Sequence, residues 1–198
     1  MYKSYQKIYL SIYERACRFF TSIYFLINGV KFRRFSTIGI PLLDIDKDCI
    51  CEFGESFTMV NKDKFATLGR NNRCKIVVAN KAKLVIGEKV AMSNTTIVAS
   101  LSVKLGNNVM IGGGVTIVDT DFHSLNPNHW HTAADLINMK KAPVIINDNV
   151  FIGMNTIILK GVVIGSNTVI AAGSVVAKSI PDNQIWGGNP AKFIKNNA

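Results

Sequence analysis

Cysteine is scarce in this sequence, and its spacing predicts no cross-links. The 198 residues include 4 cysteines, and no secretory signal precedes them. Cys49 and Cys51 are separated by a single residue, which is too close for a CxxC redox or zinc pair, and Cys74 falls where a small apolar residue is expected. With Cys17 they form no disulfide framework, so we expect the protein to work in a reducing cytoplasm.

Acidic residues are also scarce. Asp and Glu number 13 against 23 Lys and Arg, which gives a formal net charge of +10. Such an excess invites a nucleic-acid partner, but the basic residues are spread along the chain and are not interleaved with aromatic residues on one strand or helix. We therefore expect no nucleic-acid partner. Small anionic ligands and membrane lipids explain the excess more simply.

A repeat of six residues dominates the second half of the chain. A branched aliphatic residue recurs at every sixth position, and a small or β-forming residue follows each one by four positions. The aliphatic series is Ile146, Ile152, Ile158, Ile164, Ile170 and Val176. A helix of 3.6 residues per turn and a plain alternating strand both lack this period. One short strand followed by a bend has it, so the repeat predicts an all-β solenoid, the parallel β-helix.

The same period extends toward the N-terminus with two interruptions. Earlier members of the aliphatic series are Leu68, Cys74, Asn80, Ile86, Met92, Val98, Leu105, Ile111 and Ile117. The step from Val98 to Leu105 is seven residues, which we interpret as a bulge at a corner. Between Ile117 and Ile146 the hexads stop. The segment from Asp119 to Pro143 is therefore expected to be a loop that leaves the regular coil.

Helical periodicity replaces the hexads at the N-terminus. Up to about Phe35, apolar residues are spaced by threes and fours with basic residues beside them. We assign residues 1–45 to an amphipathic helical extension and residues 46–198 to the β-helix. The segment is not uniformly apolar over the roughly 20 residues that a bilayer span requires. Two roles stay open: the helix covers the unpaired edges of the first coil, or it lies on an anionic membrane surface.

All three histidines lie in the predicted loop, at His123, His129 and His131. A solenoid carries no reactive side chains on its core face, so loops and grooves are expected to supply the chemistry. Histidine is well suited to accept a proton near neutral pH, and His123 follows the last hexad by only a few residues. We therefore predict His123 as a general base. No Cys or Ser beside a base offers itself as a nucleophile.

Several features together resemble a known family. They are the hexads, the loop sequence Thr120–Ser124, the return through Asn149–Gly153 and the ending Gly187–Lys195. Over roughly Leu68 to Lys195 the chain is similar to the left-handed β-helix acyltransferases, and most of all to sugar O-acetyltransferases of the maltose and galactoside type and their capsule and lipopolysaccharide relatives. The resemblance implies left-handed coiling, a homotrimer, acetyl-CoA between adjacent coils and direct attack by an acceptor hydroxyl.

The resemblance also implies roles for individual residues. His123 matches the loop histidine that deprotonates the acceptor. Phe151 stands where the family often has Trp, which keeps an apolar wall without the indole N–H. The pantetheine track is implied at Gly153, Met154, Ala172 and Ala177, and the CoA phosphates at Lys178, Lys192 and Lys195.

Three further positions concern the acceptor. Asn94 is similar in position to a family asparagine that contacts the acceptor, although a plain corner asparagine explains it as well. Asp121 would orient the imidazole of His123 or contact the sugar. Trp130 would stack on a sugar ring or hold the loop in place. No metal is expected.

Three alternative functions stay open. An N-acetyltransferase that acts on an amino sugar stays within the enzyme class, since no residue decides between oxygen and nitrogen. A zinc enzyme like the γ-class carbonic anhydrases needs ligands from rigid strands, whereas the three histidines here share one short loop. A non-catalytic scaffold would need neither the loop histidine nor the basic ending. We expect a cytoplasmic protein, with contact to the inner membrane surface if the N-terminal helix binds lipid.

Overall fold

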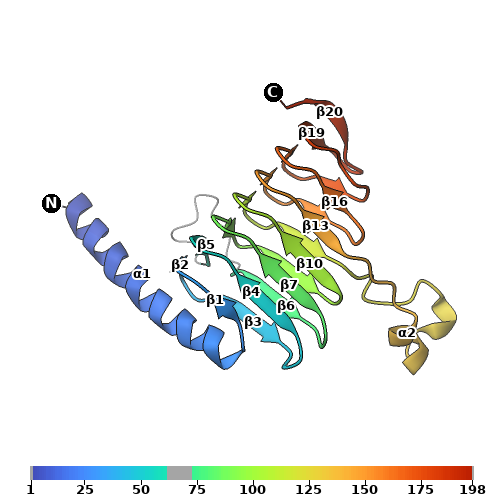
Figure 1. Ribbon diagram of the computed structural model, residues 1–198, viewed down its shortest axis with the longest axis horizontal. Coiled ribbons are helices and arrows are strands. Elements are labelled where there is room, and N and C mark those ends of the chain that lie inside the picture. The colour runs from blue at the N-terminus through green and yellow to red at the C-terminus, as the bar shows by residue number, and fades with distance from the viewer. Residues whose placement is uncertain (1, 62–72, 198) are drawn as a thin grey trace.

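The chain folds as a three-sided parallel β-helix with one helix across its first coil (Figure 1). The structure, a computed structural model, describes residues 2–61 and 73–197, with side chains from Tyr9 onward. Up to β18, strands that stand three apart in chain order pair side by side in parallel, and the second sheet then ends in the antiparallel pair β19–β20. The predicted left-handed parallel β-helix is confirmed.

Three sheets form the faces. The first sheet contains β1 (Lys31–Phe32), β4 (Ile50–Phe53), β7 (Lys83–Ile86), β10 (Ser102–Leu105), β13 (Val144–Ile146) and β16 (Val163–Ile164). The second contains β2 (Phe35–Ile38), β5 (Phe57–Val60), β8 (Ala91–Ser93), β11 (Met110–Ile111), β14 (Phe151–Ile152), β17 (Val169–Ile170), β19 (Gln184–Gly187) and β20 (Lys192–Asn196). The third contains β3 (Leu42–Ile45), β6 (Lys75–Val78), β9 (Thr96–Ala99), β12 (Thr116–Val118), β15 (Ile157–Ile158) and β18 (Val175–Val176).

The hexads build the core as expected. In each short strand one residue points outward and the next points into the solenoid: Phe151 is exposed, whereas Ile152 is fully buried. Ile152 pairs in register with Ile111 on one side and Ile170 on the other, so the aliphatic residues of successive coils stack on one another. Burying each such side chain contributes about 1.5–3 kcal/mol, which explains why the position accepts branched aliphatic residues.

Before residue 105 the repeat matches the prediction at Ile86 and Met92, which are buried and pair with Leu105 and Ile111, but it differs at other positions. Asn80 is exposed and Val98 is half-buried, whereas Ile76 and Ile97 point inward; Leu68 lies outside the described residues. Ile97 follows Met92 by five positions because Asn94, with a φ of 48°, turns the corner in one residue fewer. The corner between β9 and β10 is longer by two residues. The irregularity is therefore a short corner followed by a long one, not the single bulge we expected.

One corner of the solenoid is built from stacked asparagines. Asn108, Asn149, Asn167 and Asn183 all adopt a positive φ between 55° and 59°. The side-chain amide of each of the first three is hydrogen-bonded to the next, at 2.8, 3.1 and 3.0 Å. Asparagine tolerates this backbone conformation better than most residues, so the corner turns with little strain.

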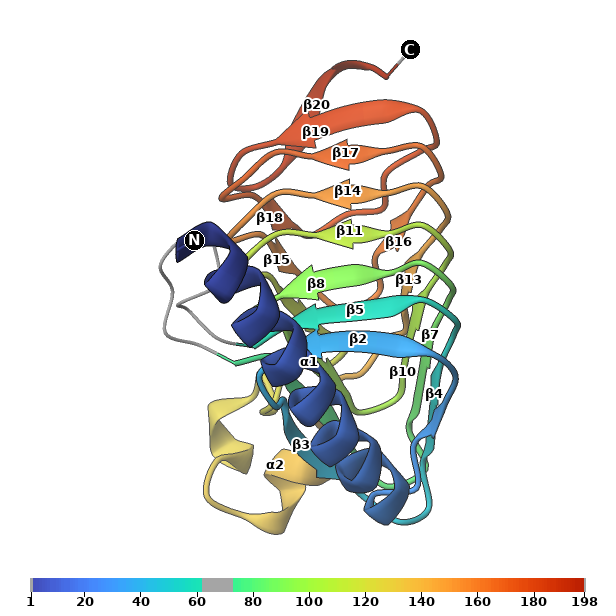
Figure 2. The ribbon, with the colours of Figure 1, turned by 90° about the vertical axis from the view of Figure 1, so that its left-hand side faces the viewer.

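The helix α1 (Tyr2–Ile27) lies across the N-terminal end of the solenoid (Figure 2). Cys17, Thr21 and Phe25 form its buried face, and the ring of Phe25 lies 5.2 Å from that of Phe53 in the first sheet. Of the two roles left open for the helix, covering the first coil is seen in this packing. The helical part ends at Ile27 rather than at residue 45, because residues 31–45 already pair as the strands of the first coil.

The predicted loop leaves the solenoid between β12 and β13. It contains the short helices η2 (Pro127–His129) and α2 (Ala133–Ile137) and projects well beyond the coil (Figure 1). Asp119, the first residue of the loop, anchors it to the coil. Its fully buried carboxylate accepts hydrogen bonds from the backbone N–H groups of Ser100, Leu101 and Ser102, each at 2.7 Å. The long corner between β9 and β10, in the preceding coil, therefore holds the start of the loop in place.

Candidate functional site

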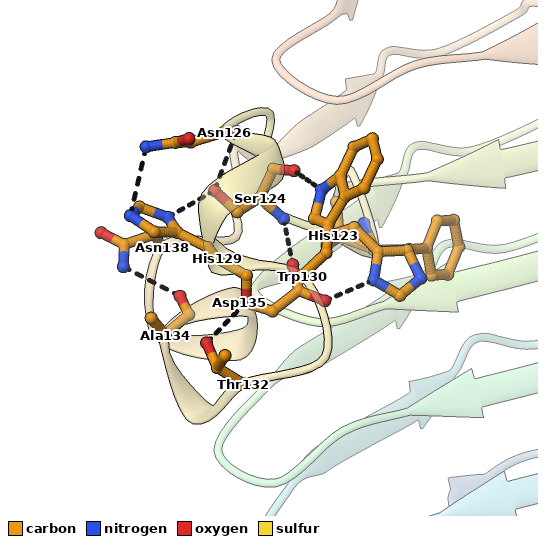
Figure 3. Close-up of polar contacts among 11 residues, drawn as sticks. His123, Ser124, Asn126, His129, Trp130, Thr132, Ala134, Asp135 and Asn138 are labelled. Carbon is orange, nitrogen blue, oxygen red and sulfur yellow. Dashed lines mark hydrogen bonds and ion pairs between the residues drawn. The ribbon is translucent and has the colours of Figure 1, made fainter.

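The loop holds His123 beside a buried carboxylate (Figure 3). Nδ1 of His123 lies 2.7 Å from Oδ2 of Asp135, and Oδ1 of the same carboxylate accepts a hydrogen bond of 2.7 Å from the backbone N–H of Ser124. Asp135 is buried, whereas the His123 side chain is 71% exposed. The carboxylate is thus fixed from two sides, and it holds one edge of the imidazole while the opposite edge stays open.

This arrangement sets the tautomer of His123. The hydrogen bond to His123 and the Ser124 N–H lower the pKa of the Asp135 carboxyl from its ordinary value, so the group is ionised near neutral pH. An ionised carboxylate only accepts hydrogen bonds, so Nδ1 of His123 carries the shared hydrogen. In the neutral imidazole the lone pair is then on Nε2. This is the atom that a general base in this position would use.

Trp130 holds the loop in place. Its indole Nε1–H donates to the carbonyl oxygen of Ser124 at 2.8 Å, and the Ser124 hydroxyl oxygen lies 2.9 Å from Nδ1 of His129. Trp130 is still 49% exposed, and with His123, His131 and Asp135 it lines a hollow of about 320 Å³. The structure therefore gives Trp130 the holding role and leaves an aromatic surface beside His123.

Asp121 does not orient the imidazole. Its Oδ1 accepts a hydrogen bond of 2.6 Å from Nζ of Lys160, at a corner of the next coil. In a regular strand, Asp121 and His123 would point to the same side because they are two residues apart. Phe122 between them has a φ of 64°, which turns the chain and separates the two side chains. The orienting residue is Asp135 instead. The expectation that Asp121 contacts an acceptor stays a prediction.

Asn94 lies away from His123 within one chain. It precedes β9 at one end of the third sheet, whereas the loop leaves from the opposite end of that sheet, after β12. Asn94 is buried and its backbone N–H donates to Val60. Together with Met92, Gly112 and Phe151 it lines an open groove of about 280 Å³.

The residues assigned to CoA fall into three places. Gly153, Met154 and Ala172 lie at the same sheet end as Asn94, where the N–H of Gly173 donates to the Met154 carbonyl at 2.8 Å. A Cβ atom on Gly153 would meet the Ala172 nitrogen at 2.4 Å, so successive coils touch there. Ala177 and Lys178 follow β18, at the end from which the loop leaves. Lys192 and Lys195 are exposed on β20. A single chain does not bring all of these residues together.

Sequence reasoning missed Asp135 and Lys160. Asp135 is three residues after Thr132, a spacing typical of a helix start, and α2 does begin at Ala133 with Thr132 as its N-cap. That pattern predicts the helix but not the fold of α2 back onto His123. Lys160 follows a regular hexad, and nothing in its sequence position predicts its ion pair with Asp121.

The described side chains form neither a metal-binding cluster nor a membrane span. In residues 2–61 and 73–197, no three His, Cys, Asp or Glu residues are grouped closely enough to hold a metal ion. His123 and His129 have different partners, Asp135 and Ser124. No helix within these ranges is both long and apolar enough to cross a bilayer.

Comparison with known proteins finds the same repeat and the same fold in other chains. Residues 143–178 match the family described as bacterial transferase hexapeptide (six repeats). Galactoside O-acetyltransferase of Escherichia coli (strain K12) is 36% identical over 137 residues, which are 68% of this chain and 65% of that protein. WbbJ of the same strain, named as a lipopolysaccharide biosynthesis O-acetyl transferase, is 29% identical over 175 residues, 86% of this chain and 83% of WbbJ.

A solved structure shares the fold. AntD, an N-acyltransferase from Bacillus cereus in complex with dTDP and coenzyme A, superimposes with a TM-score of 0.65 and 18% identity over 87% of this chain and 88% of its own. The chain spans about half to two thirds of the length of the first curated relatives that it matches. In its repeat, its fold and these relatives, the chain is similar to the hexapeptide-repeat transferases.

Proposed function

We propose that this protein transfers the acetyl group of acetyl-CoA to a hydroxyl group of a sugar or a surface-polysaccharide precursor. The observation that carries the proposal is the His123–Asp135 pair, in which a buried carboxylate holds Nδ1 of a largely exposed imidazole that lines a hollow beside Trp130. The names of the galactoside enzyme and WbbJ support an O-acetyl acceptor of the sugar class.

The proposed reaction proceeds by direct attack. Nε2 of His123 accepts the proton of the acceptor hydroxyl as the oxygen attacks the thioester carbonyl, and Asp135 stabilises the imidazolium that forms. A backbone N–H stabilises the tetrahedral oxyanion. The intermediate then collapses, the carbon–sulfur bond breaks, and the CoA thiolate takes the proton from Nε2. The products are an acetyl ester and free CoA, with no covalent enzyme intermediate.

We place acetyl-CoA along the coil corners of a homotrimer. Phe151, Gly153, Met154, Ala172 and Ala177 would contact the pantetheine, and Lys178, Lys192 and Lys195 the phosphates. In one chain the Asn94 groove and His123 lie at opposite ends of the third sheet. A trimer that sets the loop of one subunit against the Asn94 corner of its neighbour would complete the site. Asp121 would contact the acceptor there, and the protein would act in the cytoplasm without a metal.

Acetyl transfer to an amino group is the second candidate, because AntD is named an N-acyltransferase and shares the fold. A base at Nε2 of His123 serves an amine as well as a hydroxyl. The two products differ in chemistry: an ester is cleaved by hydroxylamine, and an amide resists it.

The test is release of CoA thiol from acetyl-CoA in the presence of a panel of galactosides, glucosides, maltose, amino sugars and serine. We expect turnover with a sugar and a hydroxylamine-sensitive acetyl product. A hydroxylamine-resistant product would replace the O-acetyl proposal with the N-acetyl one. Absence of turnover with every acceptor, despite tight binding of CoA, would favour a scaffold. Loss of turnover with chelator, restored by zinc, would contradict the metal-free reaction.

A further inference from the structure

The outer face of α1 is apolar although the opposite face already covers the solenoid. At about 100° per residue, the buried residues Cys17, Thr21 and Phe25 occupy one side of the helix. Six exposed apolar residues occupy the opposite side, namely Ile12, Phe19, Phe20, Ile23, Leu26 and Ile27. Capping the coil therefore uses only one side of the helix, and in the described part of the chain the opposite side is exposed.

A cluster of arginines borders this apolar face on one side. Arg15, Arg18, Arg33 and Arg34 line a hollow of about 390 Å³ whose wall includes Phe19 of the apolar face. Arg34 is 2.7 Å from Glu55 and so has its charge compensated. Within the part of the chain that the structure describes, no ion pair involves the other three. An uncompensated positive cluster thus directly joins an exposed apolar stripe.

We propose that α1 docks the protein on an anionic phospholipid bilayer, with its outer face among the acyl chains and the arginine hollow around lipid phosphates. A helix with an apolar face and a basic border is the type that lies in the membrane interface, and guanidinium groups suit phosphate oxygens. No helix in the described ranges is long and apolar enough to cross a membrane, which agrees with a helix that lies on the surface.

A second copy of this chain fits the same face less well. Two copies related by a twofold axis perpendicular to the helix would place both arginine clusters along the same border of the interface, where the like charges would repel. The lipid surface supplies apolar and anionic groups side by side. It also leaves the rest of the solenoid in water, because α1 lies at the N-terminal end and the β19–β20 hairpin at the far end (Figure 1).

The test is sedimentation of the full-length protein with vesicles of phosphatidylcholine alone or of equimolar phosphatidylcholine and phosphatidylglycerol. We expect binding to the anionic vesicles that weakens as salt rises. The triple variant Arg15→Gln, Arg18→Gln, Arg33→Gln should bind on the order of 100-fold more weakly, since each basic residue near such a surface contributes about fivefold. These side chains are exposed, so the fold does not depend on them.

A matched control removes the same charge elsewhere. Lys83, Lys89 and Lys104 are exposed, and changing all three to Gln should leave vesicle binding within a few-fold. The pair Phe19→Ser and Leu26→Ser should also abolish binding. Equal loss in both charge variants would mean a general electrostatic attraction and would overturn the docking site.

Other outcomes also decide against the proposal. Equal binding to neutral vesicles would remove the phosphate role. Competition by inorganic phosphate with no vesicle binding would make the hollow a soluble anion site. Self-association that disappears with Phe19→Ser and Leu26→Ser would make a second copy the occupant. Acetyl transfer in lipid-free solution should be unchanged in all these variants, so a failure here is separable from a failure of the proposed reaction.

Discussion

The replacement Asp135→Asn tests the geometry of the loop more sharply than a deletion does. Ser124 N–H requires an acceptor at the Oδ1 position, and the carbonyl oxygen of the new amide would take that place. The amide NH₂ would then lie at the Oδ2 position, 2.7 Å from Nδ1 of His123, and would donate to it. The neutral imidazole would be forced to carry its hydrogen on Nε2, and the lone pair needed for catalysis would be lost.

The expected loss of turnover is the full contribution of a positioned general base, about 10²–10⁴-fold in kcat. Asp135→Ala should lose less, because it leaves the imidazole free to adopt either tautomer. The assay is the steady-state release of CoA thiol with the best acceptor of the panel. Turnover of Asp135→Asn above that of Asp135→Ala would refute the reasoning from tautomers.

A pH dependence of stability separates this effect from a misfolded loop. The pKa of Asp135 is lowered in the folded protein, so its contribution to stability is present above the ordinary aspartate pKa of about 4 and is lost as pH falls through the lower folded value. The difference in Tm between wild type and Asp135→Asn should therefore be largest near neutral pH and shrink in acid. A difference that grows in acid would contradict the assignment.

Three further predictions follow from the fold and the proposed cofactor site. Asp119→Asn replaces one of the two carboxylate oxygens that accept from three backbone N–H groups, so the free energy of unfolding in urea should fall by about 2–3 kcal/mol. The exposed change Asp44→Asn is the near-neutral control, and equal effects of the two changes would discount the anchor. Gly165→Ala places a Cβ atom 2.4 Å from the Asp182 nitrogen, so the free energy of unfolding should fall by about 1–3 kcal/mol in the same urea experiment. For the neighbouring control Ser166→Ala, the free energy of unfolding should change by no more than about 0.5 kcal/mol. Changing Lys178, Lys192 and Lys195 to Gln should weaken CoA binding, measured by calorimetry, and should reduce its salt dependence. The same change at Lys83, Lys89 and Lys104 is the control and should have neither effect. An unchanged dissociation constant in the first variant would place the phosphates elsewhere.

The repeat and the loop were predictable from sequence because each depends on local pattern. Positions such as Ile152 and Ile170 must be apolar to be buried, and the hexads stop where the chain leaves the coil. The phase at Val98, where Ile97 points inward instead, was not predictable. It depends on the left-handed turn at Asn94, and many asparagines in this sequence adopt that conformation without changing the length of a corner.

The site was predictable only in part. The location of His123 followed from the interrupted repeat, but its partner depends on how α2 folds back, a contact across twelve positions of irregular chain. The periodicity of the N-terminal segment predicted an amphipathic helix. It gave no indication that both faces would be apolar in the fold, one against the first coil and one outward.

The central claim, that His123 is the general base, is tested most directly by the kcat of His123→Ala for thiol release from acetyl-CoA. We expect a loss of about 10²–10⁴-fold with little change in Tm, since the side chain is largely exposed. His129→Gln, in the same loop, serves as the control and should remain within a few-fold of wild type. Turnover of His123→Ala within a few-fold of wild type would contradict the account.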